Sequence, residues 1–167
     1  MIKESQEKYL STLPDGKVIV IKPFDPKAKE TAKQLIDQLK KTLPELEIHF
    51  GGAVALEIAG QNDIDINILS TPEDYDKYSP IIEKLFGKPL RRGTSVKWSF
   101  KKNGFDIELY LNNKNSLDFQ DQMKVFEILS RDKELRDQYE RVKMPFGLID
   151  FKDYMRKKYE FFNKILP

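Results

Sequence analysis

Two aspartates interrupt an apolar segment of the chain, in the sequence HFGGAVALEIAGQNDIDINIL that covers residues 49–69. Successive side chains of a β-strand point to opposite faces, so Asp63 and Asp65 share one face while the isoleucines between and after them share the other. Two carboxylates about 6.6 Å apart along one strand face repel each other, and the arrangement is unfavourable unless a cation or several donors lie between them. We therefore expect this pair to bind a cation, and the expected cation is Mg²⁺.

Composition limits the function of such a pair. The chain has 167 residues, of which 40% are hydrophobic, and this suffices for one domain with a buried core. Its 29 basic and 27 acidic residues leave a net charge of +2, so no overall field favours a nucleic acid or a membrane. Cysteine is absent, which excludes disulfides and thiolate zinc sites. With no apolar run of about 18 residues and no signal-peptide core, we expect a cytoplasmic protein.

Hydrophobic periodicity predicts an α/β (α+β) fold, with a small mixed sheet flanked by helices and a helical C-terminal half. Residues 1–16 form a polar lead-in and residues 17–167 a single domain, in which 17–111 carry the sheet and the site. Residues 112–167 are expected to be helical. The expected helices cover residues 25–43, 53–58, 71–87 with a restart at Pro80, 116–129, 130–143 and 150–166, and expected strands include 17–24, 46–50, the aspartate strand and two strands within 95–111.

A hairpin is predicted where Asn103 and Gly104 separate two apolar runs, because this dipeptide favours the tight turn between antiparallel strands. On the returning strand, Asp106 and Glu108 share one face. The apolar residues Phe105, Ile107, Leu109 and Leu111 are not expected to share a single side, and we expect the strand to be covered on both faces. Asp106 is the expected third carboxylate of the site.

A glycine pair, Gly51 and Gly52, follows the strand over residues 46–50 and precedes a short helical turn. Glycines leave backbone amides uncovered, and the start of a helical turn directs its free N–H groups the same way, which suits a phosphate. Three carboxylates beside a phosphate site are what Mg²⁺-dependent phosphoryl or nucleotidyl transfer needs, because hard cations take oxygen ligands and share them with substrate phosphates.

This arrangement of glycine pair, acid-apolar-acid and a third acid on a later strand resembles the nucleotidyltransferase superfamily typified by DNA polymerase beta. Within it, the sequence IHFGG at residues 48–52 is similar to the motif of the GrpB-like proteins, although Gly52 stands where they usually have serine. The segment 126–143, with Tyr139 and Lys143, resembles a helical segment of that family, and YMRKKYEFF is similar to its terminal helix.

The resemblance implies a nucleotidyltransferase that moves an NMP from an NTP, expected to be ATP, to a hydroxyl or phosphate of an unidentified acceptor. It implies that Asp63, Asp65 and Asp106 are catalytic residues that bind Mg²⁺, with Mn²⁺ as a substitute. Gly51 and Gly52 are expected to bind the nucleotide. No membrane partner and no extended nucleic-acid contact are expected, but an RNA end remains among the open acceptors.

Several alternatives stay open. The chain can be a catalytically inactive nucleotide- or partner-binding module with the same fold, or an unrelated α/β interaction protein whose acids are solvated surface residues. The glycine pair can be a tight turn only, and the basic segment 91–97 either contacts a triphosphate or is a solvated loop. The sequence assigns no role to His49 or Glu108.

Overall fold

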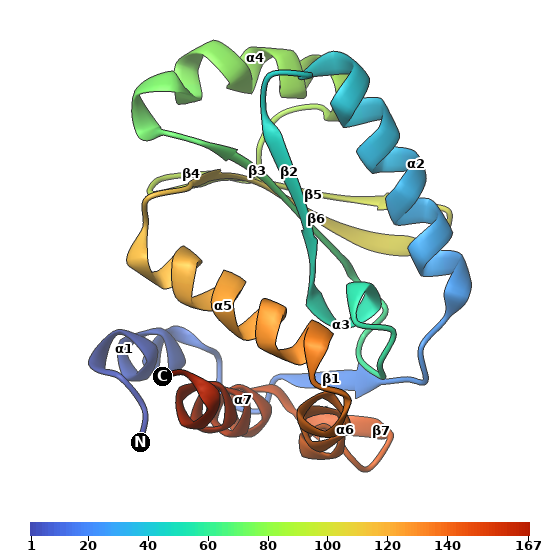
Figure 1. The fold of residues 1–167 in the computed structure, drawn as a ribbon, viewed down its shortest axis with the longest axis vertical. Coiled ribbons are helices and arrows are strands. Elements are labelled where there is room, and N and C mark those ends of the chain that lie inside the picture. The colour runs from blue at the N-terminus through green and yellow to red at the C-terminus, as the bar shows by residue number, and fades with distance from the viewer.

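The computed structural model describes residues 1–167, the whole chain, and its largest element is a five-stranded sheet (Figure 1). β3 and β6 run parallel, and every other neighbouring pair is antiparallel. The predicted α/β class with a mixed sheet is confirmed. In spatial order the strands are β2 (Glu47–Gly51), β3 (Ile64–Ser70), β6 (Phe105–Asn113), β5 (Val96–Lys102) and β4 (Arg91–Arg92).

One face of the sheet is apolar and lies against two helices, α2 (Pro26–Thr42) and α4 (Tyr75–Phe86) (Figure 1). On β6, Ile107, Leu109 and Leu111 are all buried on this face and alternate with polar residues. The expectation that the apolar residues of β6 do not share one side is therefore wrong, because strict alternation places every odd-numbered residue together.

Local sequence explains the main elements around this core. The carboxylate of Asp25 accepts a hydrogen bond of 2.9 Å from the backbone amide of Lys27, and Pro26 occupies the first position of α2. Asn103 and Gly104 have φ values of 53° and 82°, which give the predicted two-residue hairpin between β5 and β6. α4 runs through Pro80 without the expected restart, after a 3₁₀ turn at Pro72–Asp74.

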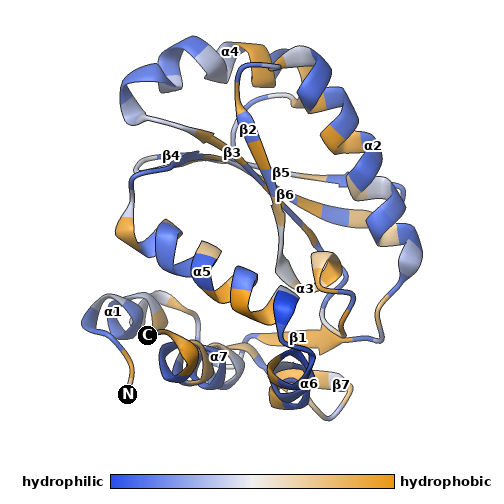
Figure 2. Ribbon diagram, in the orientation of Figure 1, coloured by the Kyte–Doolittle hydropathy of each residue, from blue (hydrophilic) through white to orange (hydrophobic).

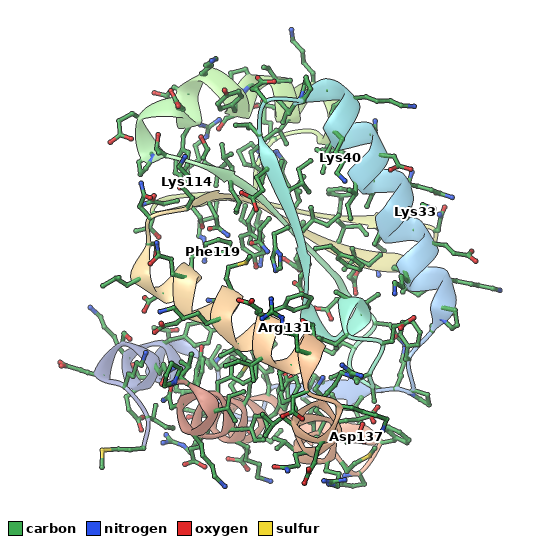
Figure 3. All side chains as sticks on the ribbon, in the orientation of Figure 1. Lys33, Lys40, Lys114, Phe119, Arg131 and Asp137 are labelled. Atoms are coloured by element: carbon green, nitrogen blue, oxygen red, sulfur yellow. The ribbon has the colours of Figure 1, made fainter.

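The other face of the sheet is polar and looks toward α5 (Leu117–Arg131) (Figure 1). His49 of β2 meets Phe126 of α5 edge to face, with ring centroids 4.9 Å apart. Figure 3 shows that side chains of both layers extend into the space between α5 and the sheet. The polar face of the sheet is therefore partly covered by the C-terminal half of the chain.

The first strand, β1 (Val18–Ile21), does not join the main sheet but pairs with β7 (Gly147–Asp150). It is apolar along its whole length, as its colour in Figure 2 shows. The polar lead-in contains a helix, α1 (Glu4–Thr12), which packs against α7 (Phe151–Ile165) through the buried side chain of Leu10. These pairings join the two ends of the sequence, and local periodicity does not reveal them.

A loop over residues 56–62 connects α3 (Gly52–Ala55) to the aspartate strand. Leu56 and Ile58 of this loop pack against α5 and against Tyr139 of α6 (Lys133–Val142). The segment that leads into the aspartate strand is thus held between the sheet and the C-terminal helices. No helix of the protein combines the length and the apolar character required to cross a membrane.

Candidate active site

The aspartate pair lies at the beginning of β3, with Asp63 immediately before the strand and Asp65 within it. Both side chains are half-buried. Burial is the main cause that raises the pKa of Asp65 to about 8, and the charge of Asp63 adds to the shift. Burial likewise raises the pKa of Asp63, against the opposing effects of its own backbone amide and of Lys158. At neutral pH Asp65 therefore holds a proton that an ordinary aspartate releases.

Gly52 lies directly against the Asp65 carboxylate. β2 and β3 pair so that Gly51 is opposite Asp65, and Gly52 follows with a φ of 77°. A Cβ atom added at Gly52 would clash with Oδ2 of Asp65. Glycine is thus required at position 52 for two reasons, the left-handed backbone and the closeness of the carboxylate.

The structure places both predicted glycines beside one of the predicted aspartates, Asp65. Gly51 is buried, and a Cβ atom there would lie 3.0 Å from Nε2 of His49. Burial lowers the pKa of His49, while Glu47 opposes this shift, so burial favours the neutral imidazole. His49 accordingly packs between the glycine segment and Phe126 of α5.

Asp106 lies at an exposed position and is paired with a lysine. Its carboxylate is 62% exposed and forms an ion pair of 2.7 Å with Lys101, its partner across the hairpin. The parallel register instead pairs Asp65 with Glu108, and the charge of Glu108 raises the pKa of both Asp63 and Asp65. The third carboxylate beside the pair is therefore Glu108, which lies two residues farther along the same strand face.

Glu108 is held by β5. Its Oε2 lies 2.6 Å from Nζ of Lys97, although the angles are not those of a directed hydrogen bond, and its Oε1 accepts a hydrogen bond of 3.3 Å from the hydroxyl of Ser99. Burial lowers the pKa of Lys97, but the contacts with Glu108 and Tyr110 outweigh burial and raise it. Lys97 therefore stays charged at neutral pH, and Glu108 is locally neutralised.

Lysines approach the aspartate pair from several elements. Lys97 of β5 and Lys158 of α7 both lower the pKa of Asp65 through their charge. None of the ten ion pairs of the structure includes Asp63 or Asp65. No group of three or more His, Asp or Glu side chains is placed closely enough to hold a metal ion as the side chains stand. The positive charge around the pair thus acts from beyond ion-pair distance.

Sequence reasoning missed Glu108 as a neighbour of the pair. Both acids of β6 were visible on one strand face, and alternation treats them alike. The choice between them depends on the parallel register of β3 and β6, which places Ile64 beside Ile107. Such a register joins segments about 40 residues apart, and no local sequence pattern determines it.

Solved structures with this fold include nucleotidyltransferases. The Cid1 poly(U) polymerase with MgGTP bound aligns with a TM-score of 0.52 and 20% sequence identity, over 84% of this chain and 46% of that chain. A second structure of Cid1, described through its RNA terminal uridylyl transferase activity, aligns with a TM-score of 0.53 and 16% identity, over 84% and 45% of the two chains. The chain spans about half the length of these proteins, and the likeness shows the nucleotidyltransferase fold.

No curated protein matches the chain. The model of the GrpB protein family matches residues 18–167, which include both glycines, all the carboxylates described above and the C-terminal helices. The match covers nearly the whole chain and agrees with the resemblance inferred from its motifs. The protein is therefore a member of the GrpB family with a nucleotidyltransferase fold.

Proposed function

We propose that the protein is a nucleotidyltransferase that transfers an NMP from an NTP, with ATP as the expected donor, to a hydroxyl or phosphate of an acceptor. The observation that carries this proposal is the half-buried pair of Asp63 and Asp65, of which Asp65 lies against the backbone of Gly52. In this proposal Glu108 takes the part that the sequence suggested for Asp106, because Glu108 is the acid paired with Asp65.

The chemistry of the donors suits a divalent cation, although the three side chains would have to move closer together to bind one. Asp63, Asp65 and Glu108 provide only carboxylate oxygens, which are the ligands that Mg²⁺ prefers and Mn²⁺ accepts. Burial is the main cause of the raised pKa values of the two aspartates, and repulsion from neighbouring carboxylates adds to it. A cation of charge +2 would remove this repulsion and would replace the proton that Asp65 holds.

The reaction forms a bond from the acceptor oxygen to the α-phosphorus and breaks the bond from that phosphorus to the bridging oxygen. The electron pair of the broken bond leaves with pyrophosphate, and the acceptor proton passes to the carboxylate of Glu108. When bound, the metal would supply charge neutralisation at the phosphate oxygens. Gly51 and Gly52 would let the phosphates approach the backbone, and placement would supply most of the catalysis.

A second candidate is an inactive module that binds a nucleotide or a partner through the same fold. The ion pair of 2.6 Å between Glu108 and Lys97 favours it, because a carboxylate neutralised by lysine is a weaker metal ligand. Binding of Mg²⁺ and NTP without turnover would support this function and would exclude the transferase.

The test is an incubation with each of the four α-³²P-labelled NTPs and Mg²⁺, with separate acceptor pools of RNA, small metabolites and protein. Transfer of label to one pool, with release of pyrophosphate, is the expected result. The Asp65→Asn protein is the matched negative control, and Asp106→Asn controls for the loss of a strand carboxylate outside the pair. Equal labelling by wild type and Asp65→Asn would contradict the proposal.

A further inference from the structure

Side chains from the end of α6 bind Ala59, a residue of the loop that leads into the aspartate strand. The side chain of Glu140 accepts a hydrogen bond of 2.7 Å from the backbone amide of Ala59, and Nζ of Lys143 donates one of 2.7 Å to the carbonyl oxygen of the same residue. Glu140 and Lys143 are three residues apart, at the end of α6, and therefore lie on one side of it. Both polar groups of a buried backbone position are thus bound by side chains of a single helix turn.

The side chain of Lys143 is buried where it contacts the loop. It is only 1% exposed, as is Ala59, and its ammonium lies 4.3 Å from the centre of the Tyr139 ring. A Cβ atom at Gly60 would lie 3.8 Å from Nζ of Lys143 and only 2.8 Å from Cβ of Ala53, so glycine lets the loop pack closely here. A buried ammonium is costly unless it is bonded, and its only hydrogen bond is to the loop.

The same loop is fixed from its other side. Gly60 exchanges two backbone hydrogen bonds, of 2.8 and 3.0 Å, with Lys22. Asn62 accepts a hydrogen bond from the amide of Asp25 and donates one to the carbonyl of Pro23, at 3.1 and 3.0 Å. With these contacts and those of α6, little freedom remains in the segment that ends at Asp63.

We propose that Glu140 and Lys143 are positioning residues for the aspartate pair, because they fix the backbone of Ala59 and so set where Asp63 enters the site. They act through the loop and do not contact substrate. The inference rests on the proposed function, since its first readout is the binding of a divalent cation by Asp63 and Asp65. The proposal extends the site to α6, which lies about 80 residues farther along the sequence than the loop.

A purely electrostatic role of Lys143 predicts the opposite result from a positioning role. Removing a positive charge near two carboxylates strengthens cation binding, whereas releasing the loop weakens it. The measurement is best made at pH 8, because burial lowers the pKa of Lys143 to about 7 and its charge is then mostly lost. A neutral amine still donates to the Ala59 carbonyl.

The test is a titration of the metal-free protein with Mn²⁺, followed by electron paramagnetic resonance of the free ion. Lys143→Met keeps the length of the side chain and Glu140→Leu removes the acceptor, and each is expected to lower Mn²⁺ affinity about tenfold or more. Glu140→Gln retains an acceptor oxygen and should stay within about twofold of wild type. Arg141→Met, an exposed position of the same helix, is the matched control and should leave affinity unchanged.

A second readout separates this inference from the proposed function. In the metal-free protein, Glu140→Leu should accelerate hydrogen exchange at the Ala59 amide, while Glu140→Gln and Arg141→Met should not. If wild type binds no Mn²⁺, the proposed function fails. Unchanged hydrogen exchange at the Ala59 amide in Glu140→Leu would show that α6 does not fix this loop residue. An Mn²⁺ affinity equal to that of wild type in Lys143→Met or Glu140→Leu would overturn the positioning role. If Lys143→Met does not fold, the comparison of Glu140→Leu with Glu140→Gln tests that role.

Discussion

The carboxylate of Asp65 occupies the space that a side chain at Gly52 would need. The strand that carries the acid and the glycine turn therefore fit each other before any ligand binds. A bulky residue at position 52 would disturb Asp65 as well as the approach of a phosphate, so a loss of NTP affinity in such a variant would not report on the phosphate alone.

We predict that Gly52→Ala lowers the free energy of unfolding by more than Gly104→Ala does. Both glycines have a left-handed φ, of 77° and 82°, but a Cβ atom at Gly104 meets nothing within 4 Å. Backbone strain of about 1 kcal/mol or more is common to both, and the clash with Asp65 is added only at Gly52. Urea unfolding of the two variants measures the difference, and equal losses would mean that the carboxylate moves away freely.

The metal-free protein should lose stability as the pH rises, because of Asp65. Its pKa is about 8 in the folded protein, against an ordinary value of about 3.9 in the unfolded chain. The folded state therefore binds the proton more tightly, and this contribution to stability is fully present below pH 4 and is lost as the pH rises toward 8. Asp65→Asn cannot ionise, and its stability relative to wild type should improve between pH 5 and pH 9 by on the order of a few kcal/mol.

Urea unfolding in EDTA at the two pH values measures this change. Asp106→Asn is the control, since Asp106 is 62% exposed and its ion pair with Lys101 contributes little. If Asp65 were instead a stabilised, ionised strand residue, Asp65→Asn would be less stable than wild type at both pH values.

Mg²⁺ should raise the melting temperature more at pH 9 than at pH 6. Protons compete with the metal for both aspartates, whose pKa values are raised, and the pKa of about 8 means that Asp65 holds its proton into the neutral range. Thermal melts with and without Mg²⁺ at each pH give the two shifts. A shift that is independent of pH would mean that the cation binds elsewhere.

Glu108→Gln should abolish nucleotide transfer, whereas Asp106→Asn should retain it. The register places Glu108 beside Asp65 and leaves Asp106 paired with Lys101 on an exposed edge. Initial rates with saturating NTP and Mg²⁺ distinguish the two carboxylates. The reverse pattern would restore Asp106 as the third acid of the site.

The sequence predicted the features that depend on neighbouring residues. Alternation placed Asp63 and Asp65 on one face, Asp25 and Pro26 marked the start of α2, and Asn103 with its glycine marked the hairpin. In each case the cause lies within a few residues, in the pleat of a strand, a cap or a turn.

The features that the sequence did not predict depend on distant partners. Glu108 joins the site through the register with β3, and Val18 pairs with Asp150 across most of the chain. The contacts of Lys143 with the loop are equally remote, since 84 positions separate it from Ala59. Hydrophobic periodicity predicts which face of a strand or helix is apolar but does not predict which segment will cover that face.

The pairing of β1 with β7 has a consequence for the order of folding. All five strands of the main sheet lie within residues 47–113, so the sheet can form early during synthesis. β1, made first, has no partner until Gly147–Asp150 has left the ribosome, and only then does Lys22 beside it come to rest against Gly60. Contacts of such long sequence separation form late. A nascent chain can thus carry a finished sheet while the loop over residues 56–62, which leads to Asp63, still lacks its contacts with Lys22 and α6.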